Sequence, residues 1–230
     1  MSTTRIKVTA DGPYLVSGAV PLRRMVVAVN DRGEVCAWRD DRVYAVEHNY
    51  ALCRCGRSAN APFCDGSHVR LGFDGAERAR RKPYLDLARR FRGPTLELTD
   101  AVELCASARF CDRAGGTWRL THRSDDPEAR QTAIQEAADC PAGRLVVWDR
   151  SGRPIEPVLE PSIGLVVDAP LDVSGPLWVR GGIPIEATDG YVYEIRNRVT
   201  LCRCGKSRNM PFCDGSHLRF GFRAGDELPE

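Results

Sequence analysis

Hydrophobic and polar residues alternate over short stretches near both ends of the chain, and the spacing becomes helical only near its middle. β-branched runs on either side of the turn at 30–33 predict a hairpin over residues 25–38. Apolar runs at 43–46 and 191–195 predict strands that lead directly into two cysteine-rich stretches. Both ends of the chain are therefore expected to be β-rich.

The strongest helical pattern covers residues 126–139. Asp126 is a good N-cap residue, and Pro127 fits the first helical turn, where its missing N–H costs nothing. The apolar residues that recur at helical spacing are Ala133, Ile134, Ala137 and Ala138. Cys140, followed by a proline, is expected to end the helix.

Three further elements are expected in the middle of the chain. A helix is predicted over 99–111, with residue 99 or 100 as its cap. Residues 144–157 predict a strand and the turn of a hairpin, and four prolines between 154 and 170 predict an extended linker. The fold class expected overall is α+β and β-rich, with an α/β segment in the middle.

A unit of about 60 residues occurs twice in the chain. The stretch CRCGRSANAPFCDGSH at 53–68 returns as CRCGKSRNMPFCDGSH at 202–217, and both copies carry VSG upstream, at 16–18 and 173–175. We therefore predict three segments, 1–80, 81–160 and 161–230, of which the first and third are copies of one unit.

Net charge, apolar runs and cysteine content limit the kinds of partner and the cellular location expected for this protein. A formal net charge of +2 is too small to indicate nucleic acid or a membrane surface as a partner. No apolar run approaches the roughly 18 residues of a spanning helix, and the first residues do not resemble a secretory signal. We expect a cytoplasmic protein, in which ten cysteines are more often metal ligands or redox groups than structural disulfides.

Each repeated stretch has the spacing C-x-C-x8-C-x3-H. Cys53 and Cys55 can reach one metal atom, and Cys64 and His68 share one face if they lie on a helical turn. A zinc ion and a [2Fe–2S] cluster both accept three cysteines and one histidine, so the spacing leaves both open.

The sequence FCDGSH after Pro62 and Pro211 predicts a loop that turns into one short helix. Asp65 and Asp214 are expected to cap this helix by accepting hydrogen bonds from the backbone N–H groups just ahead of them.

Both stretches match C-x-C-x2-(S/T)-x3-P-x-C-D-G-(S/A/T)-H without a departure, and the chain therefore resembles the CDGSH iron–sulfur family, to which mitoNEET-like proteins belong. The resemblance implies one [2Fe–2S] cluster in each motif, two in all. The ligands that it implies are Cys53, Cys55, Cys64 and His68, then Cys202, Cys204, Cys213 and His217.

Members of the mitoNEET type are dimers that exchange strands between identical subunits. This chain contains both halves, so the resemblance implies that its two units pair as an internal pseudo-dimer around an approximate two-fold axis, within a monomer. The alternative is two separate units joined by the chain. The VSG stretches are expected to be the pairing strands.

Four cations lie beside the motifs in sequence: Arg54, Arg57, Arg203 and Lys206. We interpret them as exposed surface charges, with screening of a negatively charged cluster site or docking of an acidic partner as the alternatives.

Three more cysteines, Cys105, Cys111 and Cys140, lie in the middle segment. This segment resembles the divergent single-cluster ferredoxin-type domain, whose first pair reads C-x-H-x3-C, but Ser107 stands at the histidine position. His122 or Cys36 could supply a fourth ligand only through tertiary contact. We therefore expect the middle segment to hold no cluster and the chain to bind about four irons, two in each [2Fe–2S] unit.

No catalytic triad, phosphate-binding loop or dinucleotide fingerprint occurs in the sequence. The leading hypothesis is a non-enzymatic protein that carries electrons, or passes its cluster, to a redox or apo-acceptor protein. The alternatives are a subunit that wires electrons to a partner oxidoreductase, and a regulatory module that senses iron or redox state.

Overall fold

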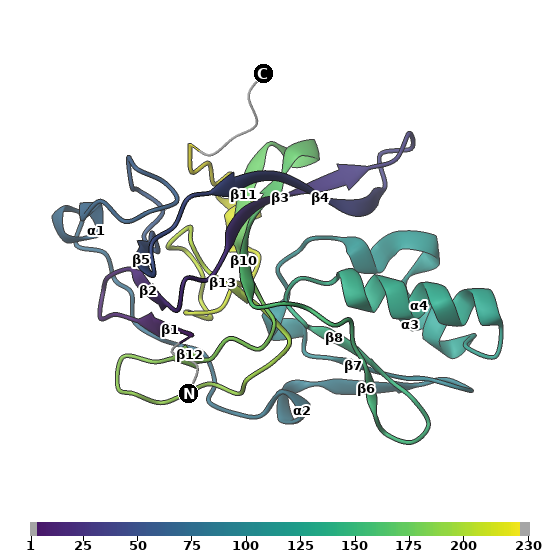
Figure 1. The fold of residues 1–230 in the computed structure, drawn as a ribbon. Coiled ribbons are helices and arrows are strands. Elements are labelled where there is room, and N and C mark those ends of the chain that lie inside the picture. The colour runs from purple at the N-terminus through teal and green to yellow at the C-terminus, as the bar shows by residue number, and fades with distance from the viewer. Residues whose placement is uncertain (1–3, 226–230) are drawn as a thin grey trace.

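A computed structural model describes residues 4–225, which form three β-sheets with a pair of helices on one side (Figure 1). The N-terminal unit contains β1 (Arg5–Val8), β2 (Tyr14–Ser17), β3 (Leu22–Val29), β4 (Val35–Tyr44), β5 (Asn49–Leu52) and the single-turn helix α1 (Ser67–Arg70). The C-terminal unit contains β10 (Ser162–Asp168), β11 (Val173–Arg180), β12 (Ile185–Glu186), β13 (Arg198–Leu201) and α5 (Ser216–Arg219). Within these residues no helix is long and apolar enough to cross a bilayer.

The two units exchange strands, one from the C-terminal unit and two from the N-terminal unit. Strands β1, β2 and β5 form a sheet whose outer member is β12 of the C-terminal unit, and β10, β11 and β13 form a sheet that continues into β3 and β4 of the N-terminal unit. The units join in the same way at both junctions, because β3 runs parallel to β10 and β12 runs parallel to β1. One hydrophobic core contains residues of both units. The expected β-rich α+β fold with an internal pseudo-dimer is confirmed.

The VSG stretches are not the exchanged strands, so that prediction was wrong. Ser17 ends β2, which pairs only with β1 and β5, while Ser174 lies in β11, which pairs with β10 and β13. Aligning the two repeats on VSG matches residues that are not structurally equivalent. Leu52 and Leu201 each precede the first cysteine of a motif, and they face Tyr14 and Leu177, so Leu177 is the structural counterpart of Tyr14. A turn (η3, Ala169–Leu171) and a bulge lengthen the C-terminal unit at this point.

The predicted hairpin at 25–38 is confirmed as β3 and β4, which extend beyond it at both ends. The strands predicted at 43–46 and 191–195 are largely wrong. Only the first two residues of 43–46 belong to β4, and 191–195 forms a single bridge, because β12 is too short to pair with more of it. The strands that lead into the motifs are β5 and β13.

The linker predicted between 154 and 170 is also wrong in part, because it contains the buried strand β10. Pro161 lies just before β10 and Pro170 just after it, so the prolines border the strand instead of excluding it.

The middle segment forms its own sheet, in the order β6-β7-β8-β9, covered by two helices (Figure 1). Its elements are α2 (Tyr84–Leu87), β6 (Arg89–Arg92), β7 (Glu97–Asp100), η1 (Val102–Leu104), η2 (Phe110–Gly115), α3 (Thr117–His122), α4 (Pro127–Asp139), β8 (Leu145–Trp148) and β9 (Pro154–Ile155). The hairpin predicted at 144–157 is confirmed as β8 and β9.

The helix predicted over 99–111 does not form. Its first two residues end strand β7, and the rest contains only η1 and the start of η2. Asp100 is not a helix cap, because its carboxylate receives hydrogen bonds from Arg144 and from the Trp118 indole. Pairing of β7 with β8 therefore overrides the local helical pattern.

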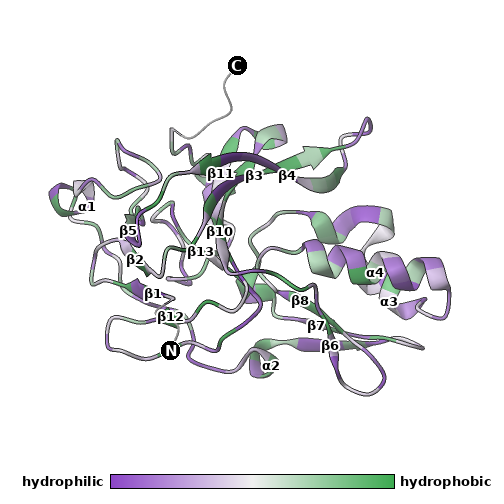
Figure 2. Cartoon of the chain, in the orientation of Figure 1, coloured by the Kyte–Doolittle hydropathy of each residue, from purple (hydrophilic) through white to green (hydrophobic). Residues whose placement is uncertain are grey.

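Helix α4 confirms the prediction for 126–139. Asp126 Oδ1 accepts a hydrogen bond from the Glu128 N–H at 3.0 Å, and Ala133 and Ala137 are buried. Figure 2 colours this helix in alternating hydrophilic and hydrophobic bands. The sequence pattern did not reveal that Glu136 is also fully buried on this face.

Glu136 should make the protein less stable as the pH rises. Burial raises the pKa of this carboxyl from its usual range to about 7, while a hydrogen bond from Thr117 Oγ1, at 2.7 Å, partly opposes the shift. Because the folded pKa exceeds the unfolded pKa, the stability is complete below about pH 4.5 and declines as the pH rises to about 7. We expect Glu136→Gln to raise the free energy of unfolding by about 2 kcal/mol at pH 8, and by only about a quarter of that at pH 5.

Urea unfolding of both proteins between pH 5 and pH 8 would measure this difference. Glu128→Gln, on the exposed face of the same helix, is the control and should shift stability little at either pH. A gain for Glu136→Gln that does not change with pH would show that the carboxylate is not destabilising.

Candidate metal centres

Backbone pairing holds together the two halves of each motif. In the first, the Cys53 N–H donates to the Pro62 carbonyl at 2.8 Å, and the Cys64 N–H donates to the Ala51 carbonyl at 2.9 Å. In the second, Cys202 pairs with Pro211 at 2.8 Å and Cys213 with Thr200 at 2.9 Å. Each motif is thus a continuation of β5 or β13 that folds back on itself and brings its four predicted ligands to one place.

Two polar residues of each motif fix the loop between the ligand pairs. Ser58 Oγ donates to the Phe63 carbonyl at 2.6 Å and accepts from the Asn60 N–H at 3.1 Å. Asp65 accepts from the N–H groups of Ser67 and Ala59, at 2.9 and 2.8 Å, and these bonds lower the pKa of its carboxyl well below the usual range.

The second motif repeats this pattern. Ser207 donates to the Phe212 carbonyl at 2.7 Å, and Asp214 accepts from the Ser216 N–H at 3.0 Å. The predicted hydrogen bonds from backbone N–H groups to Asp65 and Asp214 are confirmed, but neither residue is the helix cap, because the N-cap positions are Gly66 and Gly215.

The ligand side chains form two close pairs in each motif. The Sγ atoms of Cys53 and Cys55 lie 3.7 Å apart, and Cys64 Sγ lies 3.4 Å from His68 Nδ1. Two thiolates about 2.3 Å from one tetrahedral metal atom lie about 3.8 Å apart, and a thiolate and an imidazole nitrogen lie about 3.6 Å apart. Each pair therefore fits one metal atom.

The second motif has nearly the same geometry. Cys202 Sγ and Cys204 Sγ lie 3.6 Å apart, and Cys213 Sγ lies 3.4 Å from His217 Nδ1. Across residues 4–225, no three His, Cys, Asp or Glu side chains form a group able to hold one metal ion. The candidate ligands of each motif therefore form two separate pairs, one of two cysteines and one of a cysteine and a histidine.

The second site lowers the pKa of two of its four ligands, Cys202 and His217, whereas burial raises the pKa of the Cys213 thiol. A hydrogen bond from the Cys204 thiol lowers the pKa of Cys202 to about 7, and the same bond raises the pKa of Cys204, so this pair shares a single proton that a metal would displace. Burial, helped by the Arg203 guanidinium, lowers the pKa of His217 to about 4. His217 is therefore neutral at pH 7, the form that binds a metal.

Comparison with protein families agrees with this geometry. The model of the iron-binding zinc finger of the CDGSH type matches residues 11–69 and 174–218, and the model of a divergent 4Fe-4S mono-cluster matches residues 91–150. The chain contains two CDGSH domains. It is an iron–sulfur protein in which a divergent ferredoxin-type segment separates these domains. No curated protein and no solved structure matches the chain.

The two CDGSH domains differ in how far their ligands are exposed. In the second domain Cys202, Cys204, Cys213 and His217 are all buried. In the first domain only Cys53 is buried, while Cys55, Cys64 and His68 are partly exposed. Because the two motifs are nearly identical, this difference arises from what surrounds them.

The middle segment covers the second site. Cys213 packs against Ala106 and Ala142, and a Cβ placed on Gly215 would lie 2.5 Å from Ser107 Oγ. Beside it, Arg109 makes two hydrogen bonds to Asp168, at 2.6 and 2.9 Å. The ferredoxin-type segment therefore shields one CDGSH site from solvent.

The two motif loops also contact each other. A Cβ placed on Gly56 would lie 2.9 Å from the Cys204 carbonyl oxygen, and a Cβ on Gly205 would lie 2.6 Å from the Cys55 carbonyl oxygen. Both glycines have a positive φ as well. Only glycine allows this close reciprocal approach.

The interpretation of the four neighbouring cations as surface charges was wrong for two of them. Arg54 and Arg203, between the paired cysteines, are buried. Arg54 donates to the carbonyls of Gly12 and Thr9, at 2.8 and 2.9 Å. Arg203 donates in the same way to the carbonyls of Gly175 and Val166, at 2.7 and 2.9 Å. The identical C-R-C sequence of both copies was a signal for this structural role. Arg57 and Lys206 are exposed, as predicted.

The three cysteines of the middle segment lie near one another. Cys111 is half-buried, and burial, the Asp112 carboxylate and the thiols of Cys140 and Cys105 raise its pKa to about 12. Arg144 Nη1 lies 3.0 Å from Cys105 Sγ.

The two residues considered as a fourth ligand have other neighbours. His122 Nδ1 lies 3.1 Å from the Arg92 carbonyl oxygen, and the Cys36 thiol lies 3.6 Å from the Ala28 carbonyl oxygen. Whether this segment holds a cluster stays a prediction.

Proposed function

We propose that each CDGSH domain holds one [2Fe–2S] cluster and that the protein is a non-enzymatic carrier of electrons or clusters. The observation that supports this best is the arrangement of the ligands in two pairs per domain, with 3.4–3.7 Å between the paired atoms. A [2Fe–2S] cluster needs two ligands on each of two irons, whereas a zinc finger needs four on one ion.

When bound, a [2Fe–2S] cluster supplies one-electron redox chemistry. The chain's contribution is to orient its ligands and to supply donors to the sulfur atoms. The Gly66 N–H lies 3.5 Å from Cys64 Sγ, and the Gly215 N–H lies 3.4 Å from Cys213 Sγ. Such donors favour extra negative charge at the thiolates, and hence the reduced state.

For the middle segment we propose a docking and shielding role without a cluster. Arg144 donates to one of the three thiols and is itself bound to Asp100, so this cysteine already has a cationic partner. We further propose that the protein is a cytoplasmic monomer, since the strand exchange that joins two subunits in mitoNEET-like dimers occurs here within one chain.

Iron and sulfide analysis after anaerobic purification, with an electron paramagnetic resonance spectrum of the reduced protein, tests this proposal. We expect about four irons and four sulfides per chain. His68→Ala and His217→Ala should each remove about two irons, and the double variant nearly all. His122→Ala is the control and should retain all of them.

Full visible absorbance in the double histidine variant would contradict the ligand assignment. Seven or eight irons per chain, with the excess abolished by Cys105→Ser but not by Cys36→Ser, would show that the middle segment holds a cluster of its own.

A further inference from the structure

A groove of about 440 Å³ lies where the two motif loops meet. The first motif contributes Cys55 and Arg57, the second contributes Gly205 and Lys206, and the chain after α1 contributes Leu71 and Phe73. Of these residues Cys55 is a candidate cluster ligand. The groove is therefore an opening that leads to the first CDGSH site.

The groove carries a net positive charge. Arg57 and Lys206, which occupy equivalent positions in the two motifs, are exposed and make no ion pair with any other residue in 4–225. A third cation, Arg78, is neutralised by Asp74, whose carboxylate lies 2.6 Å from it. The two unpaired cations remain to attract an acidic partner.

Apolar side chains lie beside these charges. Leu71, just after α1, lines the groove and is 58% exposed, and Val69, on α1 itself, is 75% exposed. A protein interface commonly combines such apolar contacts with a charged rim that speeds association.

Within residues 4–225 the four candidate ligands of the second CDGSH site are buried, Cys213 against the middle segment and Cys202 and Cys204 against Met210 and Phe222. Electrons exchanged with a partner protein travel most easily through the most exposed ligand, which here is on the first site.

We infer that the groove formed by Cys55, Arg57, Lys206 and Leu71 is the docking face for an acidic redox protein, which exchanges electrons with the first cluster. This inference rests on the proposed function, since it requires a [2Fe–2S] cluster in the first domain. In the exchange one electron leaves the reduced cluster and reduces one ferric centre of the partner to the ferrous state, and no bond or proton moves.

Stopped-flow oxidation of the reduced holoprotein by two haem proteins tests the inference. The probes are a soluble acidic b-type cytochrome and the basic cytochrome c, both in the ferric state. We expect Arg57→Glu/Lys206→Glu to slow the reaction with the acidic cytochrome about tenfold at low ionic strength and to speed the reaction with cytochrome c. Added salt should reduce both effects.

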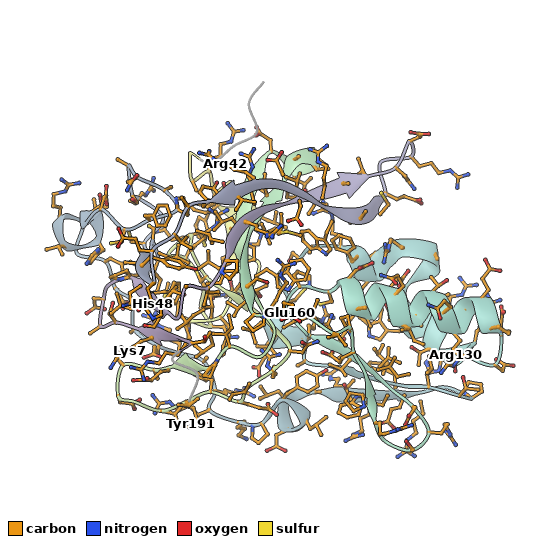
Figure 3. The ribbon with its side chains drawn as sticks, in the orientation of Figure 1. Lys7, Arg42, His48, Arg130, Glu160 and Tyr191 are labelled. Carbon is orange, nitrogen blue, oxygen red and sulfur yellow. The ribbon has the colours of Figure 1, made fainter. Side chains whose placement is uncertain are left out.

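The two probes separate docking from a change in reduction potential. Altered driving force would move both rates in the same direction, whereas altered docking moves them in opposite directions. The control is Arg119→Glu/Arg130→Glu on helices α3 and α4, and Figure 3 labels Arg130 far from the labelled His48 of the first unit. The rates at which this control variant reduces the two cytochromes should stay within about twofold of those of the unmodified protein.

Iron, sulfide and visible spectra are measured first. Absence of [2Fe–2S] clusters from the unmodified protein would overturn the proposed function and the docking face together. If the charge-reversal variant alone loses its cluster, the milder Arg57→Gln/Lys206→Gln takes its place. If the clusters are present and both variants reduce the acidic cytochrome at the rate of the unmodified protein, the proposed docking face is overturned and the proposed function is not.

Discussion

A strong iron chelator is expected to remove the cluster of the first CDGSH domain at least about tenfold faster than that of the second. Cys55, Cys64 and His68 are partly exposed, so the chelator can approach the first site directly. His217 is only 4% exposed, and the middle segment must move before its site opens. Each 1.4 kcal/mol of free energy needed for such an opening slows the loss about tenfold.

The two losses can be assigned by alkylating the released thiols during the reaction and identifying the labelled peptides by mass spectrometry. The peptide with Cys53, Cys55 and Cys64 should be labelled first. Visible absorbance should fall in two phases of similar amplitude. Simultaneous labelling of both motifs, in a single phase, would show that the middle segment does not protect the second site.

A variant that loosens the cover should bring the two rates together. Arg109→Gln removes the paired hydrogen bonds to Asp168 beside the second site, and we expect it to speed the slow phase and leave the fast phase unchanged. Arg123→Gln is the matched control, because it breaks an exposed ion pair with Asp126 in the same segment but away from the site.

The difference between the sites could not be predicted from the sequence, whereas the sites themselves could. The ligands lie within sixteen residues of one another, so their spacing reflects local geometry that each motif carries with it. The burial of Cys213 depends on Ala106 and Ala142, which are distant in sequence and come from a different domain. Nothing in the motif itself encodes that contact.

The same distinction explains the results for the fold. Helix α4 was predicted because Asp126 and Pro127 act on the first turn that follows them. Strand β10 was missed because it is stabilised by β3 and β11, and β3 lies over a hundred residues earlier in the chain. Its buried run of apolar residues, flanked by prolines, is also compatible with an extended linker.

Sequence similarity between the repeats also had a limit. The sequence VSG occurs in both repeats, but its two copies do not occupy equivalent positions in the strand register, and Tyr14 shows the consequence. Its hydroxyl donates to the carbonyls of Cys202 and Pro211, at 2.8 and 3.0 Å, so the first unit supports the second site. Leu177, at the equivalent position of the second unit, has no hydroxyl to return this contact.

Replacement of both histidine ligands by cysteine, in His68→Cys/His217→Cys, should lower the reduction potentials by about 100 mV or more and slow the acid-induced loss of both clusters. A thiolate makes each site one unit of charge more negative than a neutral imidazole does, so adding an electron becomes harder. The imidazole accepts a proton as it leaves the metal, which favours cluster loss as the pH falls. Redox titration and the decay of visible absorbance between pH 5 and pH 7 measure the two effects.

The matched control is His48→Cys/His122→Cys, which adds two cysteines at exposed positions outside the motifs. Both potentials and both rates of loss should stay unchanged in this control, because neither histidine is a candidate ligand in the pairs. If the ligand variant keeps the original potentials, the charge argument fails; if it keeps the original acid lability, the proton argument fails. Because the first site is open to water and His217 is buried, His68→Cys alone should account for most of the gain in acid resistance at early times.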